Sequence, residues 1–251
     1  MNARRVLRIT RFNFRAIGCS WITWQMLTAI VTLSAPLYGQ EHLQPTRANA
    51  ASVQNDALRR ELLSMSKEDQ KVRGETVREI SDAGFPMGSH ATPNDPKYLA
   101  VMAKVKAKTA AIDDNNRRRM KEIVDEHGWP GISLVGKDGA QAAWLLVQHS
   151  DADHEFQKTC LKLIEELPAG EMPKQASAYL TDRILVAEMK PQRYGTQMDG
   201  EFHPKPLEDP ANVDKRRAEV GLPPLDEYIK MAKAQYAKIS ESSPESDKIR
   251  H

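Results

Sequence analysis

The stretch Asp138-Gly-Ala-Gln-Ala-Ala-Trp-Leu-Leu-Val-Gln-His149 decides the fold. Asp138 is a typical residue to cap the start of a helix, and the side chains that follow it are strongly apolar. A helix that is apolar around its whole circumference is buried, so we predict a core helix over residues 139–149. His149 then lies where this helix ends, with the carboxylates of Asp151 and Asp153 directly after it.

Apolar residues at spacings of three or four predict further helices on both sides of this stretch. Residues 56–73 form the first, and residues 96–127 form either one long helix or two helices with a bend near Asp113. Asp95 suits the N-cap of the long helix, and Pro96 suits its first turn. The later helices are predicted to begin after Ser150 or Asp151 and to cover residues 172–186, 214–220 and 225–239.

The connections between these helices contain few signs of strand. Residues 132–135 are expected to form an extended link, because no partner strand is obvious, and residues 84–95 form a loop. Residues 190–209 contain Pro, Gly and aromatic residues without a period, which predicts a long ordered loop. The expected fold class is therefore all-α: a mainly helical single domain with six or seven helices, this loop, and at most a minor strand.

The N-terminal segment has the features of an export signal. Five arginines precede residue 16, and residues 16–40 contain no charged side chain. A basic region, an apolar core and a small residue, here Gly39, are typical of a cleaved secretory signal, which we place at residues 1–39. The alternative is an uncleaved inner-membrane anchor over residues 16–38. The rest of the chain is predicted to comprise a linker over 40–55, a helical domain over 56–239 and a disordered tail over 240–251.

Charge and cysteine content exclude two classes of protein. Without residues 1–39 the formal charge falls from +2 to −3, because five arginines and no acid are removed. The remaining sequence has no basic stripe interleaved with aromatic residues, so we expect no nucleic-acid partner. Cys160 is then the one cysteine left, which excludes an internal disulfide and indicates that packing stabilises the domain. Cys160 itself is expected to be a core residue.

His149 is the first candidate for chemistry. A neighbouring carboxylate such as Asp153 can orient an imidazole and hold its tautomer, as a general base requires. The candidate catalytic residues are His149, Asp153 and Asp182. In the alternative interpretation His149 has no catalytic role: it is a partly buried histidine at a helix end, and its ring N–H bonds a backbone carbonyl. The residues from His149 to His154 include metal-ligand types, but they lack a recognised zinc spacing, so we expect no metal and no cofactor.

Polar residues in further blocks are candidates for binding a ligand. Arg183 can pair with a carboxylate to clamp an anionic substrate or to brace two helices. Neutral donors and acceptors surround Gly195, and they could bind an amide, sugar or nucleoside edge or only complete a buried turn. Asp69 and Arg73 are one helical turn apart and form a stabilising pair that could also line a cleft. The candidate ligand-binding residues are Gln148, Gln157, Arg183, Gln192, Tyr194, Thr196 and Gln197.

Five blocks occur in order along the sequence. They are Asp69-Gln70-x-x-Arg73, Gly128-Trp129-Pro130, Gln148-His149-x-Asp151-x-Asp153-x-x-Phe156-Gln157, Ala178-Tyr179-Leu180-x-Asp182-Arg183 and Tyr194-Gly195-Thr196-Gln197. With these blocks the chain resembles a bacterial family of unknown function over about residues 56–230. The resemblance implies a mostly helical bacterial domain that is often exported, and it assigns no catalytic role to any residue.

We expect an exported helical domain that binds a small polar ligand or peptide in a cleft around His149. The loop over residues 192–197 is expected to pack back over the end of the His149 helix, with Asp182 and Arg183 in the wall of the cleft. A cell-envelope hydrolase or group transferase with His149 as general base is the first alternative. An interaction protein in which the five blocks determine only packing is the second.

Cleavage of the signal can be checked directly. N-terminal sequencing of the protein from its native host is expected to begin near Gln40, because the small residue Gly39 precedes it. The cytoplasmic and envelope fractions should be analysed side by side. Recovery of a chain that begins at Met1 from the soluble cytoplasmic fraction would contradict export.

Overall fold

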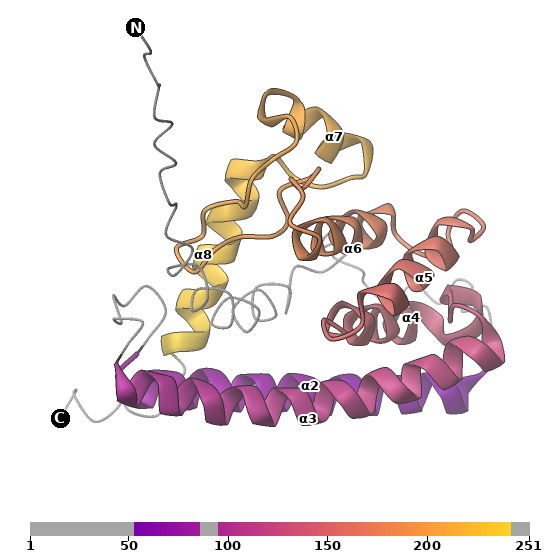
Figure 1. The fold of residues 1–251 in the computed structure, drawn as a ribbon. Helices are drawn as coiled ribbons and strands as arrows, with labels where there is room; N and C mark the ends of the chain where they lie inside the picture. The colour runs from indigo at the N-terminus through magenta and orange to yellow at the C-terminus, as the bar shows by residue number, and fades with distance from the viewer. Residues whose placement is uncertain (1–52, 86–94, 242–251) are drawn as a thin grey trace, which may run out of the picture.

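Two long antiparallel helices form the base of the molecule. α2 (Asp56–Asp82) and α3 (Pro96–His127) pack against each other and run in opposite directions along the lower edge of Figure 1. The computed structural model describes residues 53–85 and 95–241. The predicted signal over residues 1–39 lies outside the described residues, as do most of the 40–55 linker, the 84–95 loop and the 240–251 tail.

α2 is longer than the sequence predicted. Asn55 caps its first turn by accepting a hydrogen bond from the Leu58 backbone (3.0 Å). The helix continues past Arg73, where its end was expected, because Thr76 and Val77 extend the buried face. Burial of these two side chains holds the second half of α2 against its neighbours.

α3 is one continuous helix, which decides between the two alternatives. Asp95 caps it as predicted, accepting hydrogen bonds from the backbone of Lys97 and Tyr98 (2.8 and 3.4 Å). Side chains spaced by three or four residues keep one face buried from Met102 to Ile123, so the helix does not bend in the middle.

α4 (Ile132–Gln148) lies on this base and contacts both of its helices. The expectation of an extended link over residues 132–135 is wrong, because these residues form a helical turn whose last N–H, from Val135, bonds the Gly131 carbonyl (3.1 Å). Gly136, with φ of +73°, then interrupts the helix in a conformation that favours glycine. Asp138, which the sequence predicted as the N-cap, lies inside the second part of the helix; its carboxylate accepts the Gly139 N–H (2.9 Å) and hydrogen bonds from Arg59 on α2 (2.8 and 2.5 Å).

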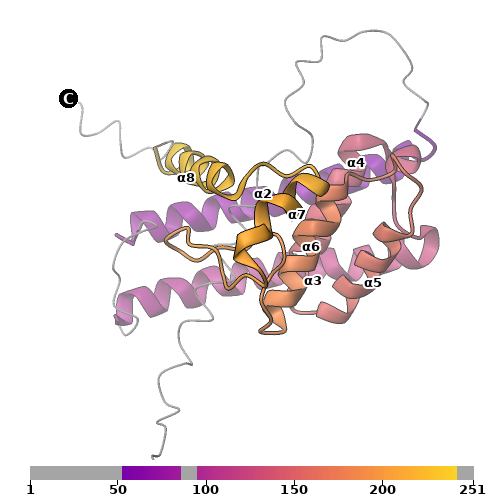
Figure 2. The same cartoon turned by 90° about the horizontal axis from the view of Figure 1, so that it is seen from above.

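The remaining helices lie on the same side of the base as α4 (Figures 1 and 2). α5 begins after Asp153, whose carboxylate accepts the Phe156 N–H (3.0 Å), so the cap is neither Ser150 nor Asp151 as predicted. The later helices start and end within a few residues of the predicted positions. They are α5 (His154–Glu165), α6 (Lys174–Ala187), a short 3-10 helix η1 (Pro210–Asn212), α7 (Val213–Glu219) and α8 (Leu225–Glu241).

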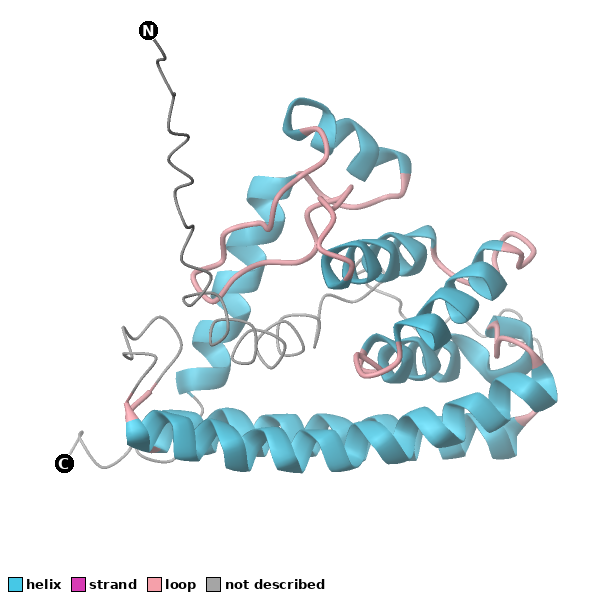
Figure 3. Cartoon of the chain, viewed as in Figure 1, coloured by secondary structure: helices cyan, strands magenta, loops and turns pink. Residues whose placement is uncertain are grey.

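The all-α fold class is confirmed. The described part of the chain contains seven α-helices and no strand, and Figure 3 shows helices joined by loops alone. The long loop between α6 and η1 carries two isolated β-bridges, Gln192 with Leu207 and Met198 with Pro204. Within the described residues no helix is long and apolar enough to cross a membrane.

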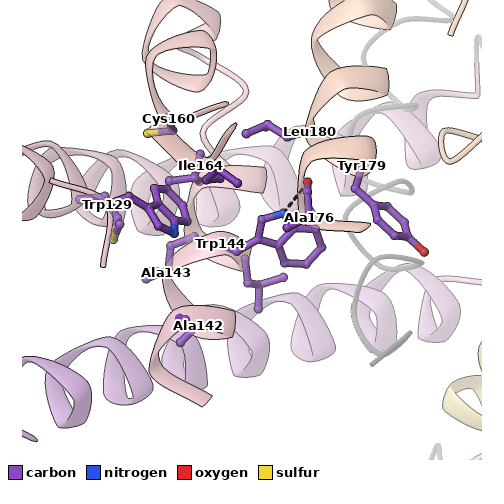
Figure 4. Close-up of a cluster of buried hydrophobic side chains, with 14 of the residues drawn as sticks. Trp129, Ala142, Ala143, Trp144, Cys160, Ile164, Ala176, Tyr179 and Leu180 are labelled. Atoms are coloured by element: carbon purple, nitrogen blue, oxygen red, sulfur yellow. Dashed lines mark hydrogen bonds between the residues drawn. The ribbon is translucent and has the colours of Figure 1, made fainter. Parts of the chain in front are cut away.

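Trp144 lies in the core between α4 and α6. Its indole N–H donates to the Ala176 carbonyl (3.1 Å), and its ring meets Tyr179 edge to face at 5.8 Å between centroids (Figure 4). Cys160 is buried in the same cluster, as expected from the sequence. Burial raises the pKa of its thiol to about 12, so the thiol stays protonated at neutral pH.

Replacing Trp144 with Ala should destabilise the chain by about 3–5 kcal/mol, because a large cavity and an unpaired carbonyl remain. Urea denaturation followed by circular dichroism measures the free energy of unfolding. The matched control is Leu99→Ala, a change at a side chain that is 47% exposed on α3, which should cost within about 0.5 kcal/mol. Equal losses in the two variants would contradict this description of the core.

Candidate functional site

His149 ends α4 and is fully enclosed by the protein. It caps the helix, and only 1% of its side chain is exposed. Its Nδ1 atom lies 2.9 Å from Oδ2 of Asp69 and 3.0 Å from Nε of Arg73, both on α2. The carboxylate that orients the imidazole therefore comes from α2. Asp153, the partner considered from the sequence, caps α5 and pairs with Lys121 (2.6 Å) instead.

These contacts determine which ring nitrogen carries the proton. A carboxylate oxygen can only accept, so a bare Nδ1 beside Asp69 would bring two lone pairs together. We therefore assign the proton to Nδ1, which donates to Asp69. The Nε–H of Arg73 lies 3.0 Å from Nδ1 and would donate to it in the other tautomer; with Nδ1 protonated it donates to the two Asp69 oxygens (3.2 Å each). In the neutral ring, Nε2 then carries the free lone pair. This atom is buried and has no hydrogen-bond partner among the described residues.

Arg73 joins the two base helices beneath His149. Its Nη2 donates to Oδ1 of Asp69 (3.1 Å) and also to Oδ1 of Asp113 on α3. Gln70 adds a further donor to Asp69 through its amide (2.9 Å). The Asp69–Arg73 pair anticipated from the sequence thus belongs to a network that joins α2, α3 and α4.

Burial and neighbouring charges separate the pKa values in this network. Burial and the charge of Arg73, acting against the opposing effect of Asp69, together lower the pKa of His149 to about 4. Burial would raise the pKa of Asp69, but His149 and Arg73 together hold it well below its usual range. Burial raises the pKa of Asp113 to about 7, against the effect of Arg73. At neutral pH Asp69 is therefore ionised and His149 is neutral.

Three potential metal ligands meet at this point, but a cationic side chain already lies among them. One atom each from Asp69, Asp113 and His149 lies within 4.8 Å of the others. The Arg73 guanidinium contacts all three residues, so a bound cation would have to displace a charged group of the same sign. These residues fit the guanidinium better than they fit a metal ion.

A second group of contacts connects the end of α4 with α6. Nη1 of Arg183 lies 2.8 Å from both carboxylate oxygens of Asp151, and its Nε donates to Oε1 of Gln148 (3.1 Å). The amide of Gln157 on α5 donates to the Val147 carbonyl (3.1 Å) and to Asp151 (3.3 Å). Gln148 and Arg183 are therefore in contact next to the end of α4, Gln157 joins them through Asp151, and these contacts brace α4 to α5 and α6.

Two nitrogens in this second group have no hydrogen-bond partner in the described part of the chain. They are Nε2 of Gln148 and Nη2 of Arg183, and both are buried. Because the Gln148 oxygen faces Arg183, its amide nitrogen lies beside the guanidinium. Together with Nε2 of His149, these atoms are two donors and one acceptor on neighbouring side chains. The charge of Arg183 also lowers the pKa of His149.

Asp182 holds the long loop in place. Its two oxygens accept the backbone N–H groups of Arg193 (2.7 Å), Tyr194 (3.0 Å) and Thr196 (2.9 Å) and the Thr196 hydroxyl (3.0 Å). Gly195 turns the chain between these donors with φ of +71°, and a Cβ there would lie 2.9 Å from Leu225. Both oxygens of Asp182 therefore hold the loop in place. Few of their lone pairs remain for the catalytic role that the sequence suggested.

Gln192 and Gln197 complete the interior of this loop. The Gln192 amide donates to the carbonyls of Gln197 and Lys205 (2.9 Å each) and accepts the Gln197 N–H (2.9 Å). The Gln197 amide donates to the Thr196 hydroxyl (3.3 Å). These polar groups are hydrogen-bonded to one another within a buried turn. Such a turn was the alternative to ligand binding for the residues around Gly195 in the sequence analysis.

Asp113 and Lys205 are parts of the site that the sequence reasoning missed. In the sequence analysis Asp113 was only the place of a possible bend, yet it lies on the buried face of α3, one turn from Thr109 and from Asn116. Its spacing of three or four residues from other buried positions could have predicted that it faces inward. Lys205 is held in the loop by backbone bonds to Gln192 and Gln197, and burial together with the charge of Arg183 lowers its pKa to about 8. No local pattern indicated this position, because the loop has no period.

The fold and the site define a class of protein: an all-α domain with a buried network of charged and polar side chains where α2, α3, α4 and α6 meet. The chain belongs to the family of unknown function DUF6624, whose model matches residues 56–240. This confirms the family resemblance seen in the sequence blocks. No curated protein and no solved structure matches the chain.

Replacing His149 with Gln should remove a pH-dependent part of the stability. The unfolded histidine takes up a proton as the pH falls through about 6.5, whereas burial keeps the folded ring neutral until about pH 4. Within this window the unfolded chain binds more protons, so the wild type loses stability relative to the variant as the pH falls. The expected slope is at most about 1.4 kcal/mol per pH unit.

The measurement is the free energy of unfolding of both proteins across the window of about pH 4–7. Asp113 has a raised pKa and contributes the opposite slope, but it is present in both proteins and largely cancels in the difference. A difference that does not change with pH would show that the His149 ring is not held neutral by burial.

Proposed function

We propose that this domain binds a small polar ligand, or the polar end of a peptide, at the end of α4. His149, Gln148 and Arg183 are the residues that would contact it. The single observation that carries the proposal is that each of these buried side chains has one polar atom without a partner in the described residues. A buried donor or acceptor left unpaired costs about 1–3 kcal/mol, so three neighbouring ones indicate that a group from outside completes them.

The pattern of hydrogen-bond donors and acceptors at these three atoms restricts the chemical groups that the ligand can present. Nε2 of Gln148 and Nη2 of Arg183 can only donate, whereas Nε2 of neutral His149 accepts. A matching ligand therefore presents an acceptor oxygen to the two donors and an O–H or N–H group to the histidine. Amides, hydroxy acids and hydrated carbonyl or phosphoryl groups have this combination.

The positions of the partly exposed residues of the network indicate from which side a ligand would reach His149. Asp113 and Asp151 each have 20% of their side chain exposed, whereas Asp69, Arg73, His149 and Arg183 are almost wholly enclosed. A ligand would enter between α3 and the turn after α4, with local opening of these contacts. The energy for such opening is small compared with global unfolding.

The role of the Tyr194–Gln197 block changes in this proposal. Thr196 and Gln197 are engaged by Asp182 and Gln192, so we assign them to the structure of the loop and not to contact with the ligand. These hydrogen bonds within the loop also favour the alternative interpretation, in which the Tyr194–Gln197 block determines packing alone. Export remains part of the proposal, supported by the arginines and the uncharged run in residues 1–40.

A second candidate function, hydrolysis or group transfer with His149 as general base, is favoured by the Asp69–His149 contact. An ionised carboxylate that accepts from Nδ1 fixes the tautomer and leaves Nε2 to take a proton. Arg183 and Gln148 would then stabilise charge on an oxygen of the substrate. Turnover of a substrate distinguishes this function from binding alone.

The binding proposal is tested by titrating the full chain with three probes: acetamide, acetate and inorganic phosphate. The 15N signals of the His149 ring should shift saturably with at least one of them, because the bound group lies against Nε2. Gln148→Met should weaken this binding by about tenfold, as expected for the loss of one buried hydrogen bond.

The matched control is Gln141→Met, a change to another glutamine of α4 that lies outside the network, and it should leave the affinity unchanged. Circular dichroism should show that both variants keep the helical fold. Absence of saturable binding of all three probes to the wild type would contradict the proposed function.

A further inference from the structure

We infer that the domain holds a second ligand site between α7 and α8, in which the buried guanidinium of Arg217 binds an oxyanion. This site shares no residue with the one proposed at the end of α4, so it does not depend on the proposed function. It follows from a charged side chain that the protein encloses fully and that contacts no acidic group among the described residues.

The contacts of Arg217 join three parts of the fold. Its Nε donates to the Pro223 carbonyl (2.6 Å) in the turn before α8, and its Nη1 donates to the Tyr194 carbonyl (2.5 Å) in the long loop. The central carbon of its guanidinium lies 4.9 Å from the centre of the Tyr228 ring on α8. These contacts fix the guanidinium between α7, the loop and α8.

The third nitrogen of this guanidinium is unused. Nη2 of Arg217 is buried and has no hydrogen-bond partner in the part of the chain that the structure describes. Both of its N–H groups can only donate, so they require an acceptor from outside. A water molecule could accept these hydrogen bonds, but it would leave the charge without compensation.

The other two buried arginines show which interaction Arg217 lacks. Arg73 and Arg183 are each paired with carboxylates. Arg217 forms no ion pair with a described residue, although Asp214 lies one turn earlier on α7; the Asp214 carboxylate accepts the Leu225 N–H (2.8 Å) instead. A buried charge is costly unless an opposite charge and hydrogen bonds compensate it. Two carbonyl dipoles and one aromatic face offset only a part of that cost.

The free nitrogen and the uncompensated charge together determine the ligand class. A guanidinium binds the oxygens of carboxylate and phosphate groups through charge-assisted hydrogen bonds. A neutral amide could accept the two N–H groups, but it would not neutralise the cation. The ligand of Arg217 is therefore an oxyanion, and its source is either a carboxylate or a phosphate group.

The turn between α7 and α8 provides the route to this site. Gly221 and Pro224 in the turn are exposed, whereas Arg217 behind it is fully buried. The Pro223 carbonyl connects the turn to the guanidinium. An oxyanion would reach Nη2 by local opening of the turn, which costs less free energy than unfolding of the domain.

The test is a titration of the full chain with acetate, inorganic phosphate and acetamide at constant ionic strength, adjusted with chloride. The arginine side chains are labelled with 15N, and the Arg217 signal is identified by its absence from the spectrum of Arg217→Lys. This signal should move saturably with at least one anion. That anion should bind at least about tenfold more tightly than acetamide, because charge-assisted hydrogen bonds are the stronger ones. The anion that binds more tightly identifies the carboxylate or the phosphate as the recognised group.

Arg217→Lys keeps the charge but loses the fork of nitrogens, so it should weaken binding of that anion by about tenfold. The ring signals of Tyr228 report on the site in the wild type and in the variants, because the ring lies against residue 217. If the Arg217→Lys chain does not fold, as circular dichroism would show, the titration of the wild type decides alone.

The matched control is Arg216→Lys on the same helix. Arg216 donates to the carbonyls of Arg193 (2.8 Å) and Asp209 (2.7 Å), and it also has a carboxylate partner in Asp209 (3.6 Å). Because its charge is already compensated, this change should leave the affinity for the anion unchanged.

The outcomes separate this inference from the proposed function. The inference is wrong if neither anion moves the Arg217 signal saturably, if acetamide binds as tightly as both anions, or if Arg217→Lys behaves like the control. Probes that move only the His149 ring signals would support the proposed function and overturn the second site. Probes that move only the Arg217 signal would do the reverse.

Discussion

The buried guanidinium of Arg73 is the contact on which the arrangement of the helices depends. It lies between Asp69 on its own helix, Asp113 on α3 and His149 at the end of α4. Removing a charge from water is costly, and the cost is offset only when the hydrogen bonds around it are nearly complete. The base helices and α4 must therefore meet in one register, because any other would leave this cation or Asp69 unpaired. An apolar core alone would specify that register less tightly.

Arg183 repeats this principle on the other side of α4. Its pairing with Asp151 and Gln148 ties α6 to the turn that follows His149. The two arginines differ in one respect that bears on function. Arg73 has its contacts inside the network, whereas Arg183 retains a nitrogen without a partner in the described residues. The α2 side of His149 is therefore closed by its own contacts, whereas the proposed ligand contacts lie on the α6 side.

The long loop shows how a structural and a functional interpretation of the same motif can both hold. Asp182 and Gln192 are engaged by backbone groups, which is the packing role. Their effect is to fix the path of a loop without regular secondary structure beside α6. A residue that contacts no ligand can still set the position of one that does.

The sequence by itself determined most of the helices. The spacing of apolar side chains and the capping residue Asp95 are local properties, so they located most helices, including the buried α4. It also grouped His149, Gln148 and Arg183 as one candidate site. Local patterns failed at residues 132–135, where a helical turn closed on Gly131 replaced the expected extended link.

Only the tertiary structure decided the partners of these residues. The sequence offered Asp153 to His149 because it is near in the chain, whereas packing of α4 on α2 brings Asp69, which is eighty positions away. Packing likewise turned Asp113 inward to Arg73 and brought Arg183 on α6 to Gln148 on α4. The physical reason is that hydrogen bonds and desolvation depend on distance in space, and helix packing sets those distances for groups remote in the sequence.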